Sequence, residues 1–266
     1  MEKPDIKALF FDVDGTLINY HDHTIHPDDL AALKKLRELG YKLFIATGRD
    51  VTVPAESKSI EPFVNVFDGF VNSNGQQCFL TDGTMITEHP LDKDDFIAIR
   101  NVCEERHYAL YYTLDNETYI TEATDLVKEF NAVVGIRVPD VRPIEPDRTH
   151  IIKACVYITP EDELKYLEPV MKHTFVTHSK GPLVDLIPEG VGKDTGIREV
   201  CDYLGITIEQ TMAFGDGEND IAMLKTAGIG VAMGIAAEEV RAAADYVTLK
   251  PEEGGIAAAL RHYGLI

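Results

Sequence analysis

Three short apolar runs of the chain each end on a set of polar residues. Runs of this kind, stopped by Asp, Thr or Gly, predict buried β-strands. In an open parallel sheet, ligands bind beyond the carboxyl ends of the strands, so we expect the three polar sets to meet at one site. The sets are Asp12-Val13-Asp14-Gly15-Thr16, Thr47-Gly48-Arg49 and Gly215-Asp216-Gly217-Glu218-Asn219-Asp220.

Such a site would crowd several carboxylates together. Crowded carboxylates repel one another and cannot all ionise cheaply. A hard divalent cation with oxygen ligands removes this problem, and Mg²⁺ is the usual choice with a phosphate substrate. Taken singly, an Asp-Gly pair after a strand is typical of a turn, and a Thr-Gly pair is typical of a strand end. Three such ends on one chain favour a metal-assisted site over three unrelated turns.

The charge of the chain limits its partners. Its 266 residues include 45 acidic and 25 basic side chains, which gives a formal net charge of −20. A field of this sign repels nucleic acids and anionic membranes, so we expect neither as a partner. A small phosphorylated metabolite stays compatible with this charge, because a divalent metal and a few placed cations invert the field locally.

The cysteines and the apolar runs bear on location. The four cysteines are far apart and form no Cys-x-x-Cys pair, which favours reduced thiols. The N-terminal stretch has no apolar run followed by a cleavage site, and no segment reaches the roughly 18 apolar residues of a membrane span. We therefore expect a cytoplasmic protein.

The predicted elements alternate strand and helix at both ends of the chain. The strand at 6–11 is followed by an amphipathic helix over 27–39 and a second strand, an order that implies parallel strands with a right-handed crossover. The middle of the chain mixes helices, hairpin-like strands and a Pro-rich loop. We predict an α/β fold with a Rossmann-like parallel-sheet core, formed by residues 1–82 and 188–266, and an inserted α+β domain over 83–187.

The polar sets resemble, in order, the motifs of the haloacid dehalogenase (HAD) superfamily of phosphohydrolases. The Asp12–Thr16 set is similar to the first motif, and Thr47-Gly48 to the second. Lys193 stands where a third-motif lysine is expected, and Gly215-Asp216 with Asn219-Asp220 is similar to the fourth. The resemblance covers nearly the whole chain. The insert resembles the type-two cap of the Cof-type, sugar-phosphatase-like subfamily, which implies that it supplies substrate specificity.

The resemblance implies a two-step hydrolysis. Asp12 would attack phosphorus and form an aspartyl-phosphate. Asp14 would act as general acid to the leaving oxygen and then as general base for water. Mg²⁺ would be held by the side chains of Asp12 and Asp216 and by the backbone carbonyl of Asp14. Asp220 would support the metal waters or orient Lys193.

The same resemblance implies a phosphate-binding set. Thr47, the backbone N–H of Gly48 and Lys193 would hold phosphate oxygens and neutralise charge in a loose transition state. Asn219 would hydrogen-bond the phosphate or Lys193.

Some positions leave alternatives open. Arg49 could reach a ligand anion or the cap, or it could pair with a surface carboxylate. Family members often have Gly after the third-motif lysine, whereas this chain has Asp194. Asp194 could be an ordinary first-turn helix residue, favoured by the helix dipole, or it could pull Lys193 away from the phosphate. Exposed loop residues are favoured over a metal cluster for His21, His23 and His26. Candidates for substrate contacts from the cap are His178, Ser179, Lys180 and Asp185.

The sequence predicts a Mg²⁺-dependent phosphatase acting on a small phosphorylated metabolite, with sugar phosphates favoured. A phosphomutase would also use an aspartyl-phosphate, but it would form an isomer instead of releasing phosphate. A non-enzymatic signalling domain would hold phospho-Asp without turnover, and Asp14 argues against that because it supplies an acid and base beside the nucleophile. The substrate and the oligomeric state stay open.

Overall fold

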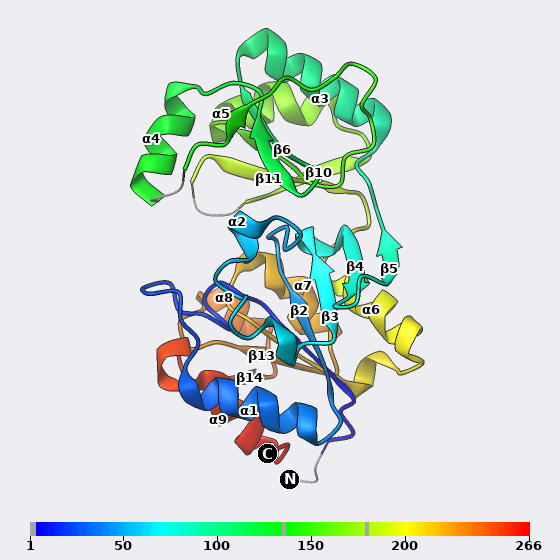
Figure 1. Ribbon diagram of the computed structural model, residues 1–266, viewed down its shortest axis with the longest axis vertical. Helices are drawn as coiled ribbons and strands as arrows, with labels where there is room; N and C mark the ends of the chain where they lie inside the picture. Colours follow the sequence, from blue (N-terminus) through cyan, green and yellow to red (C-terminus); the bar gives the residue numbers. More distant parts are fainter. Residues whose placement is uncertain (1–3, 135–136, 179–180) are drawn as a thin grey trace. The chain divides into compact units, whose positions relative to one another are not determined.

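The chain divides into two compact units in a computed structural model that describes residues 4–134, 137–178 and 181–266 (Figure 1). Unit 1 consists of Met1–Arg49, Glu56–Glu88 and Val191–Ile266. Unit 2 consists of Asp50–Ala55 and His89–Gly190. Unit 1 is therefore built from both ends of the chain.

The units end a few residues away from the predicted boundaries at 82/83 and 187/188. Strand β5 (Met85–Glu88) pairs with β4 (Gln77–Leu80) and so belongs to the sheet of unit 1. Strand β11 (Leu183–Pro188) runs in the sheet of unit 2 to its last residue. Hairpin pairing thus assigns β5 to unit 1 and β11 to unit 2. The role of unit 2 as a specificity cap stays a prediction.

Unit 1 contains an eight-stranded sheet in the order β14-β13-β12-β1-β2-β3-β4-β5. Neighbouring strands are parallel from β14 to β3, and β4 and β5 add an antiparallel edge. The predicted α/β class with a parallel sheet is confirmed. The parallel strands are β1 (Ala8–Phe11), β2 (Lys42–Ala46), β3 (Gly69–Asn72), β12 (Thr211–Gly215), β13 (Ile229–Ala232) and β14 (Tyr246–Val247).

Strand β1 lies in the middle of this sheet, and all four of its residues are buried. Phe10 stacks on Phe44 of β2 at 5.4 Å between ring centroids, and Phe11 stacks on Phe214 of β12 at 4.9 Å. In the register, Phe11 lies opposite both Ile45 and Phe214. The polar residues that follow these three strands are therefore delivered to one edge of the sheet.

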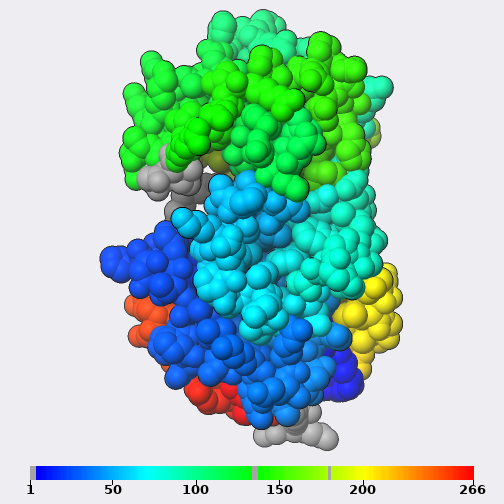
Figure 2. Space-filling model, viewed as in Figure 1, coloured from blue at the N-terminus to red at the C-terminus, as the bar shows by residue number. Residues whose placement is uncertain are grey.

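Helices cover the sheet of unit 1. Helix α1 (Pro27–Glu38) begins at the N-cap His26, with Pro27 in its first turn, and packs against α9 (Gly255–His262). On the face drawn in Figure 2, α1 lies beside Val64–Val66, where Arg37 Nη1 donates to the carbonyl of Asn65 at 2.6 Å. The apolar residues of β1 and β2 also pack against a second group of helices, which are α6 (Lys193–Leu204), α7 (Ile221–Thr226) and α8 (Glu238–Ala242).

Unit 2 contains a six-stranded sheet in the order β10-β11-β9-β6-β7-β8. Its neighbouring strands are antiparallel, except for the parallel pair of β7 and β8. Strand β8 (Asp140–Val141) lies within the Pro-rich stretch that was expected to be a loop, so that expectation was wrong at these two residues. The remaining strands are β6 (Ala109–Leu114), β7 (Glu117–Ile120), β9 (Ala154–Tyr157) and β10 (Thr174–His178).

The helices of unit 2 are α3 (Lys93–Arg106), α4 (Asp125–Val134) and α5 (Pro160–Asp162). The residues of a short helix, α2 (Pro54–Ser57), are divided between the two units. After α5 the chain continues in π geometry at Glu163–Leu167 and then in a 3₁₀ turn at Glu168–Val170. Nowhere in the described ranges is a helix both long enough and apolar enough to span a membrane.

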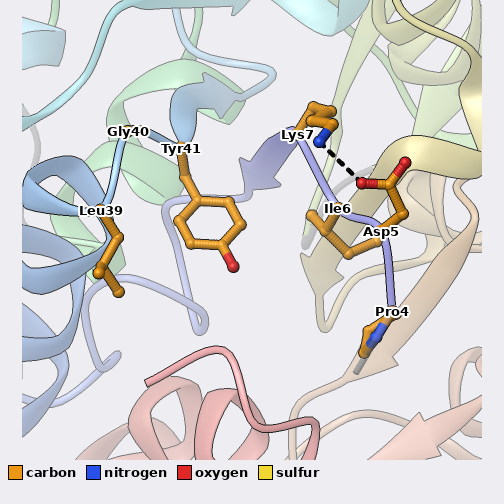
Figure 3. A pocket seen from close by; sticks show the side chains of 7 residues that line it. All are labelled: Pro4, Asp5, Ile6, Lys7, Leu39, Gly40 and Tyr41. Carbon is orange, nitrogen blue, oxygen red and sulfur yellow. Dashed lines mark ion pairs between the residues drawn. The ribbon is translucent and has the colours of Figure 1, made fainter. Parts of the chain in front are cut away.

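A hollow of about 450 Å³ lies at the amino end of β1 (Figure 3). Lys7 precedes the first residue of β1, whereas Asp12 follows its last, so the hollow and the polar sets lie at opposite ends of the strand. This hollow therefore does not belong to the candidate site. Its lining residues are Pro4, Asp5, Ile6, Lys7, Leu39, Gly40 and Tyr41.

Candidate active site

The turn after β1 places Asp12 and Asp14 at the carboxyl edge of the sheet. The backbone N–H of Asp12 donates to the carbonyl of Phe214 at 2.9 Å, so Asp12 continues the strand pairing. The chain then reverses at Gly15, whose φ of +83° is a conformation that favours glycine. A Cβ at Gly15 would collide with the carboxylate of Asp216. The Asp12 side chain is buried, and Asp14 is partly exposed.

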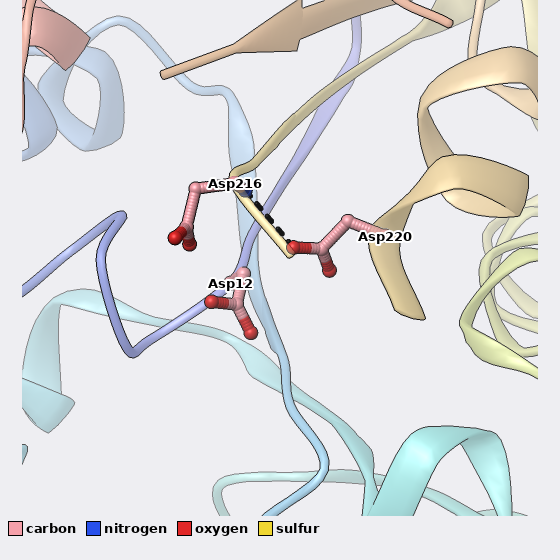
Figure 4. Close-up of side chains that lie close together, drawn as sticks. All are labelled: Asp12, Asp216 and Asp220. Carbon is pink, nitrogen blue, oxygen red and sulfur yellow. Dashed lines mark hydrogen bonds between the residues drawn. The ribbon is translucent and has the colours of Figure 1, made fainter. Parts of the chain in front are cut away.

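The loop after β12 brings two more carboxylates to Asp12. One oxygen from each of Asp12, Asp216 and Asp220 lies within 4.8 Å of the other two (Figure 4). Asp220 is fully buried, and its Oδ2 accepts from the backbone N–H groups of Asp216 and Gly217 at 3.0 Å. Asp220 thus holds the loop that carries Asp216. The structure thus brings these three candidate residues together, and their roles stay a prediction.

Lys193 lies between two of these carboxylates. It is the first residue of α6, and its Nζ donates to Asp12 Oδ1 at 2.7 Å and to Asp220 Oδ1 at 2.6 Å. Burial alone would lower the pKa of Lys193, but the charges of Asp12 and Asp220 outweigh burial and raise this pKa. Lys193 therefore stays charged. Asp194, which could have drawn Lys193 away from the phosphate, lies in the first turn of α6. The Lys193 ammonium points to Asp12 and Asp220.

The charge balance of this cluster suits a divalent cation. Lys193 supplies one positive charge against the three carboxylates. Burial, followed by the charge of Asp220, raises the pKa of Asp12 well above its ordinary range. The same causes raise the pKa of Asp216 to about 7. A cation bound among oxygen ligands would stabilise the ionised carboxylates, so the donor set present here fits Mg²⁺.

Thr47 and Gly48 follow β2 at the same edge of the sheet. Thr47 is buried, and its backbone N–H donates to the carbonyl of Val71 at 2.9 Å. Its Oγ1 accepts from the backbone N–H of Arg49 at 3.1 Å. A Cβ at Gly48 would come within 3.1 Å of the Asn74 side-chain amide, so the backbone passes close to Asn74 here.

Arg49 contacts Asp14, a partner that the sequence reasoning did not name. Its Nε donates to Asp14 Oδ2 at 2.7 Å, and its Nη2 donates to Asp14 Oδ1 at 2.5 Å. On its other side, Nη1 donates to the Glu56 carbonyl and to Ser59 Oγ, both at 2.8 Å. The guanidinium therefore fixes the candidate acid–base group in a bidentate ion pair. That Arg49 also binds a ligand anion stays a prediction.

Asn219 pairs with Asn74, which was not among the predicted site residues. Asn219 Nδ2 donates to Asn74 Oδ1 at 3.0 Å. Asn74 is buried and has a φ of +55°, next to Ser73 at +49°. Two consecutive non-glycine residues in the left-handed region are strained and often mark functional sites. The Asn-Gly turn signal in the sequence was the available clue.

Two hydroxyl groups from the turn after β1 hold Asp216. Thr16 Oγ1 donates to Asp216 Oδ1 at 3.2 Å, and the Tyr20 hydroxyl donates to Asp216 Oδ2 at 3.0 Å. Thr16 belongs to the first motif, but nothing in the sequence singled out Tyr20. Its partner is 196 positions away, so no local pattern could reveal the contact.

The remaining candidates have hydrogen-bond partners or exposure of their own. His21 and His23 are exposed, and His26 accepts from the Asp28 N–H as a helix cap. In unit 2, His178 Nε2 lies 2.9 Å from the buried carboxylate of Glu163, and Asp185 accepts from Cys155 Sγ at 2.9 Å. Two further candidates, Ser179 and Lys180, lie outside the described residues.

Comparison with known proteins identifies the architecture that carries this cluster. A family model described as haloacid dehalogenase-like hydrolase matches residues 9–260. The chain is 27% identical to the 5-amino-6-(5-phospho-D-ribitylamino)uracil phosphatase YcsE of Bacillus subtilis, over 99% of this chain and 98% of that protein.

Solved structures of HAD phosphatases are similar to this chain over nearly its whole length. The HAD phosphatase BT1666 of Bacteroides thetaiotaomicron is 34% identical, with a TM-score of 0.88 over 98% of this chain and 96% of that one. The HAD subclass IIB sugar phosphatase BT4131 is also 34% identical, with a TM-score of 0.86 over 98% of this chain and all of that one. The similarity thus covers both units and the segments that carry the cluster.

Proposed function

Because the chain belongs to the haloacid dehalogenase-like hydrolase family, we propose that it is a Mg²⁺-dependent phosphatase that hydrolyses small phosphorylated metabolites through a phosphorylated Asp12. The observation that carries this proposal is the meeting of Asp12, Asp216 and Asp220 around the Lys193 ammonium, with Asp14 two residues from Asp12. The chain has the groups that nucleophilic attack and proton transfer both need.

Two carboxylates divide the chemistry between them. An oxygen of Asp12 attacks the phosphorus atom, and the bond from phosphorus to the ester oxygen breaks. For this step Asp14 must carry a proton, so one of its two contacts with Arg49 must open, and Asp14 then gives that proton to the leaving oxygen. In the second step Asp14 takes a proton from water, the water oxygen attacks phosphorus, and the carboxylate of Asp12 is released. Before the first step, Arg49 holds Asp14 in one orientation through its bidentate contact.

The other residues hold phosphate oxygens and charge. Lys193, the Thr47 hydroxyl and the Gly48 N–H supply the positive and hydrogen-bonding groups, and Asn219 adds an amide donor. Mg²⁺ would be held by Asp12, Asp216 and the Asp14 carbonyl, where it would neutralise the charge of the phosphate group.

Relatives of this chain suggest a substrate class. BT4131 is described as a sugar phosphatase, YcsE as a phosphatase of a phosphoribitylamino-uracil, and a relative from Klebsiella pneumoniae as an HMP-PP phosphatase. We propose that a small phosphorylated metabolite, with sugar phosphates first, is the substrate. We also propose that unit 2 recognises the leaving group. His178 and Asp185 are its candidates among the described residues.

The test is phosphate release in the presence of Mg²⁺ from a panel of sugar phosphates, with HMP-PP and the phosphoribitylamino-uracil included. The Asp12→Asn variant should lose at least about 10⁴-fold in kcat, because it removes the nucleophile and keeps the volume. Asp202→Asn, an exposed position on α6, is the matched control. Near-normal turnover by Asp12→Asn would refute the proposal.

The same experiment separates the alternatives. Formation of a positional isomer of the substrate without net phosphate release would identify a phosphomutase. A phosphorylated protein that persists for hours without turnover would identify a signalling domain. Either result would overturn the phosphatase proposal.

A further inference from the structure

Tyr20 reaches from the connection between β1 and α1 to the carboxylate of Asp216. Its hydroxyl donates to Asp216 Oδ2 at 3.0 Å, although 46% of the residue is exposed. The ring passes close to Gly15, since a Cβ at Gly15 would collide with Tyr20 Cε2. The side chain therefore lies along the turn after β1, with its hydroxyl directed inward and part of its ring in contact with solvent.

The backbone on either side of Tyr20 is fixed by local hydrogen bonds. Asn19 Oδ1 accepts from the backbone N–H groups of His21 and Asp22 at 2.9 Å. Asn19 Nδ2 donates to Asp22 Oδ1 at 2.8 Å, and the same oxygen accepts from the Thr24 N–H at 2.9 Å. Hydrogen bonds from Asn and Asp side chains to the backbone two residues on are typical of Asx-turns. This turn sets the direction in which Tyr20 leaves the backbone.

The Tyr20 contact completes the immobilisation of Asp216. Thr16 donates to Oδ1 and Tyr20 donates to Oδ2, so each carboxylate oxygen carries one neutral hydroxyl donor. A carboxylate oxygen has room for a second partner, so both remain able to bind a cation. The two donors together restrict rotation of the carboxylate about its Cβ–Cγ bond.

We infer that Tyr20 is a positioning residue for the metal ligand Asp216 and increases the affinity of the protein for a divalent cation. This inference rests on the proposed function, which assigns Asp216 to the metal. Groups that hydrogen-bond to metal ligands orient them, and their removal typically costs 10- to 100-fold in metal affinity. Tyr20 acts on the ion only through Asp216 and takes no part in proton transfer.

The test is Mn²⁺ binding to the metal-free full-length protein, measured by the loss of the free Mn²⁺ electron paramagnetic resonance signal. Tyr20→Phe removes only the hydroxyl and keeps the ring against Gly15. We expect its Kd for Mn²⁺ to rise about tenfold. Tyr203→Phe, at a half-exposed position on α6, loses a hydroxyl elsewhere in unit 1 and should bind Mn²⁺ as the wild type does. The Mg²⁺ concentration for half-maximal phosphatase activity should rise by the same factor.

The outcomes separate this inference from the function on which it depends. An unchanged Kd in Tyr20→Phe would overturn the inference, even if the variant also melted at a lower temperature. A lower Kd would overturn it as well, because the hydroxyl would then compete with the ion. A wild-type protein that binds no Mn²⁺ would refute the metal site itself, and with it the proposed function.

Discussion

The buried carboxylates around Asp216 should make the stability of the metal-free protein fall as pH rises. Burial and the neighbouring Asp220 raise the pKa of Asp216 from 3.8 to about 7. A carboxyl group whose pKa is higher in the folded state binds its proton more tightly when folded, so its contribution to stability is present at low pH. That contribution is lost as pH rises through the folded-state pKa.

The size of the effect follows from the two pKa values. The difference between 3.8 and about 7 corresponds to about 4 kcal/mol in the free energy of unfolding. Between pH 5 and pH 8, about 2–3 kcal/mol of this should be lost. The pKa of Asp12 is also raised, which adds a change of the same sign. A bound divalent ion keeps these groups ionised in the folded state, so Mg²⁺ should reduce the pH dependence. Mg²⁺ at 100 times its Kd should also raise the free energy of unfolding by about 2.7 kcal/mol.

The assay is urea unfolding followed by circular dichroism at pH 5, 6, 7 and 8, with EDTA and with Mg²⁺. Comparing the EDTA and Mg²⁺ measurements at each pH cancels the contribution of titrating groups outside the cluster. Asp29 is one of these groups, because burial raises its pKa to about 6. Asp216→Asn keeps the side-chain volume and lacks the titrating group, so its EDTA series should be flatter. Metal-free protein that is as stable at pH 8 as at pH 5 would refute the reasoning, as would a pH dependence that Mg²⁺ leaves unchanged.

Two further variants test the turn and the acid–base group. Arg49→Gln should lower kcat/KM by about 100-fold for an alkyl phosphate and much less for p-nitrophenyl phosphate. The reason is that p-nitrophenolate is a good leaving group and needs little protonation from Asp14. Equal losses on both substrates would contradict a role of Arg49 through Asp14. Gly15→Ala should lower the free energy of unfolding by at least about 1 kcal/mol and weaken Mn²⁺ binding, because its Cβ would displace Asp216. Gly83→Ala, at a φ of +89° with open space around it, should show the backbone strain without the loss of metal affinity, and a loss of affinity in Gly83→Ala would count against this explanation.

The sequence was sufficient for the parts of the site that local pattern encodes. An apolar run stopped by Asp12 predicts a strand end, and parallel strands bring such ends to one edge, so the convergence of Asp12 and Asp216 could be expected. The α/β class and the family followed from the same motifs and are confirmed. The position of Lys193 depended on the resemblance, because an isolated lysine before a helix carries no signal of its own.

Contacts between side chains far apart in the chain could not be predicted in this way. The Tyr20–Asp216 and Asn219–Asn74 hydrogen bonds join residues 196 and 145 positions apart. The partner of Arg49 was likewise missed, since it depends on how two strand ends twist toward each other. The two units divide a few residues away from the predicted boundaries, because the pairing of β5 and β11 with neighbouring strands decides the sheet to which each belongs.

The position of β1 between β2 and β12 has a consequence for the order of folding during synthesis. Phe11 needs both Ile45 and Phe214 as neighbours, so the centre of the sheet stays incomplete until the ribosome has released residues beyond 214. Nearly all of unit 2 lies in the continuous stretch His89–Gly190 and emerges earlier. Domains generally fold as they emerge, and long-range strand pairing is slow. A nascent chain that ends before β12 therefore exposes an unpaired edge of β1 and lacks Asp216 and Asp220 of the carboxylate cluster.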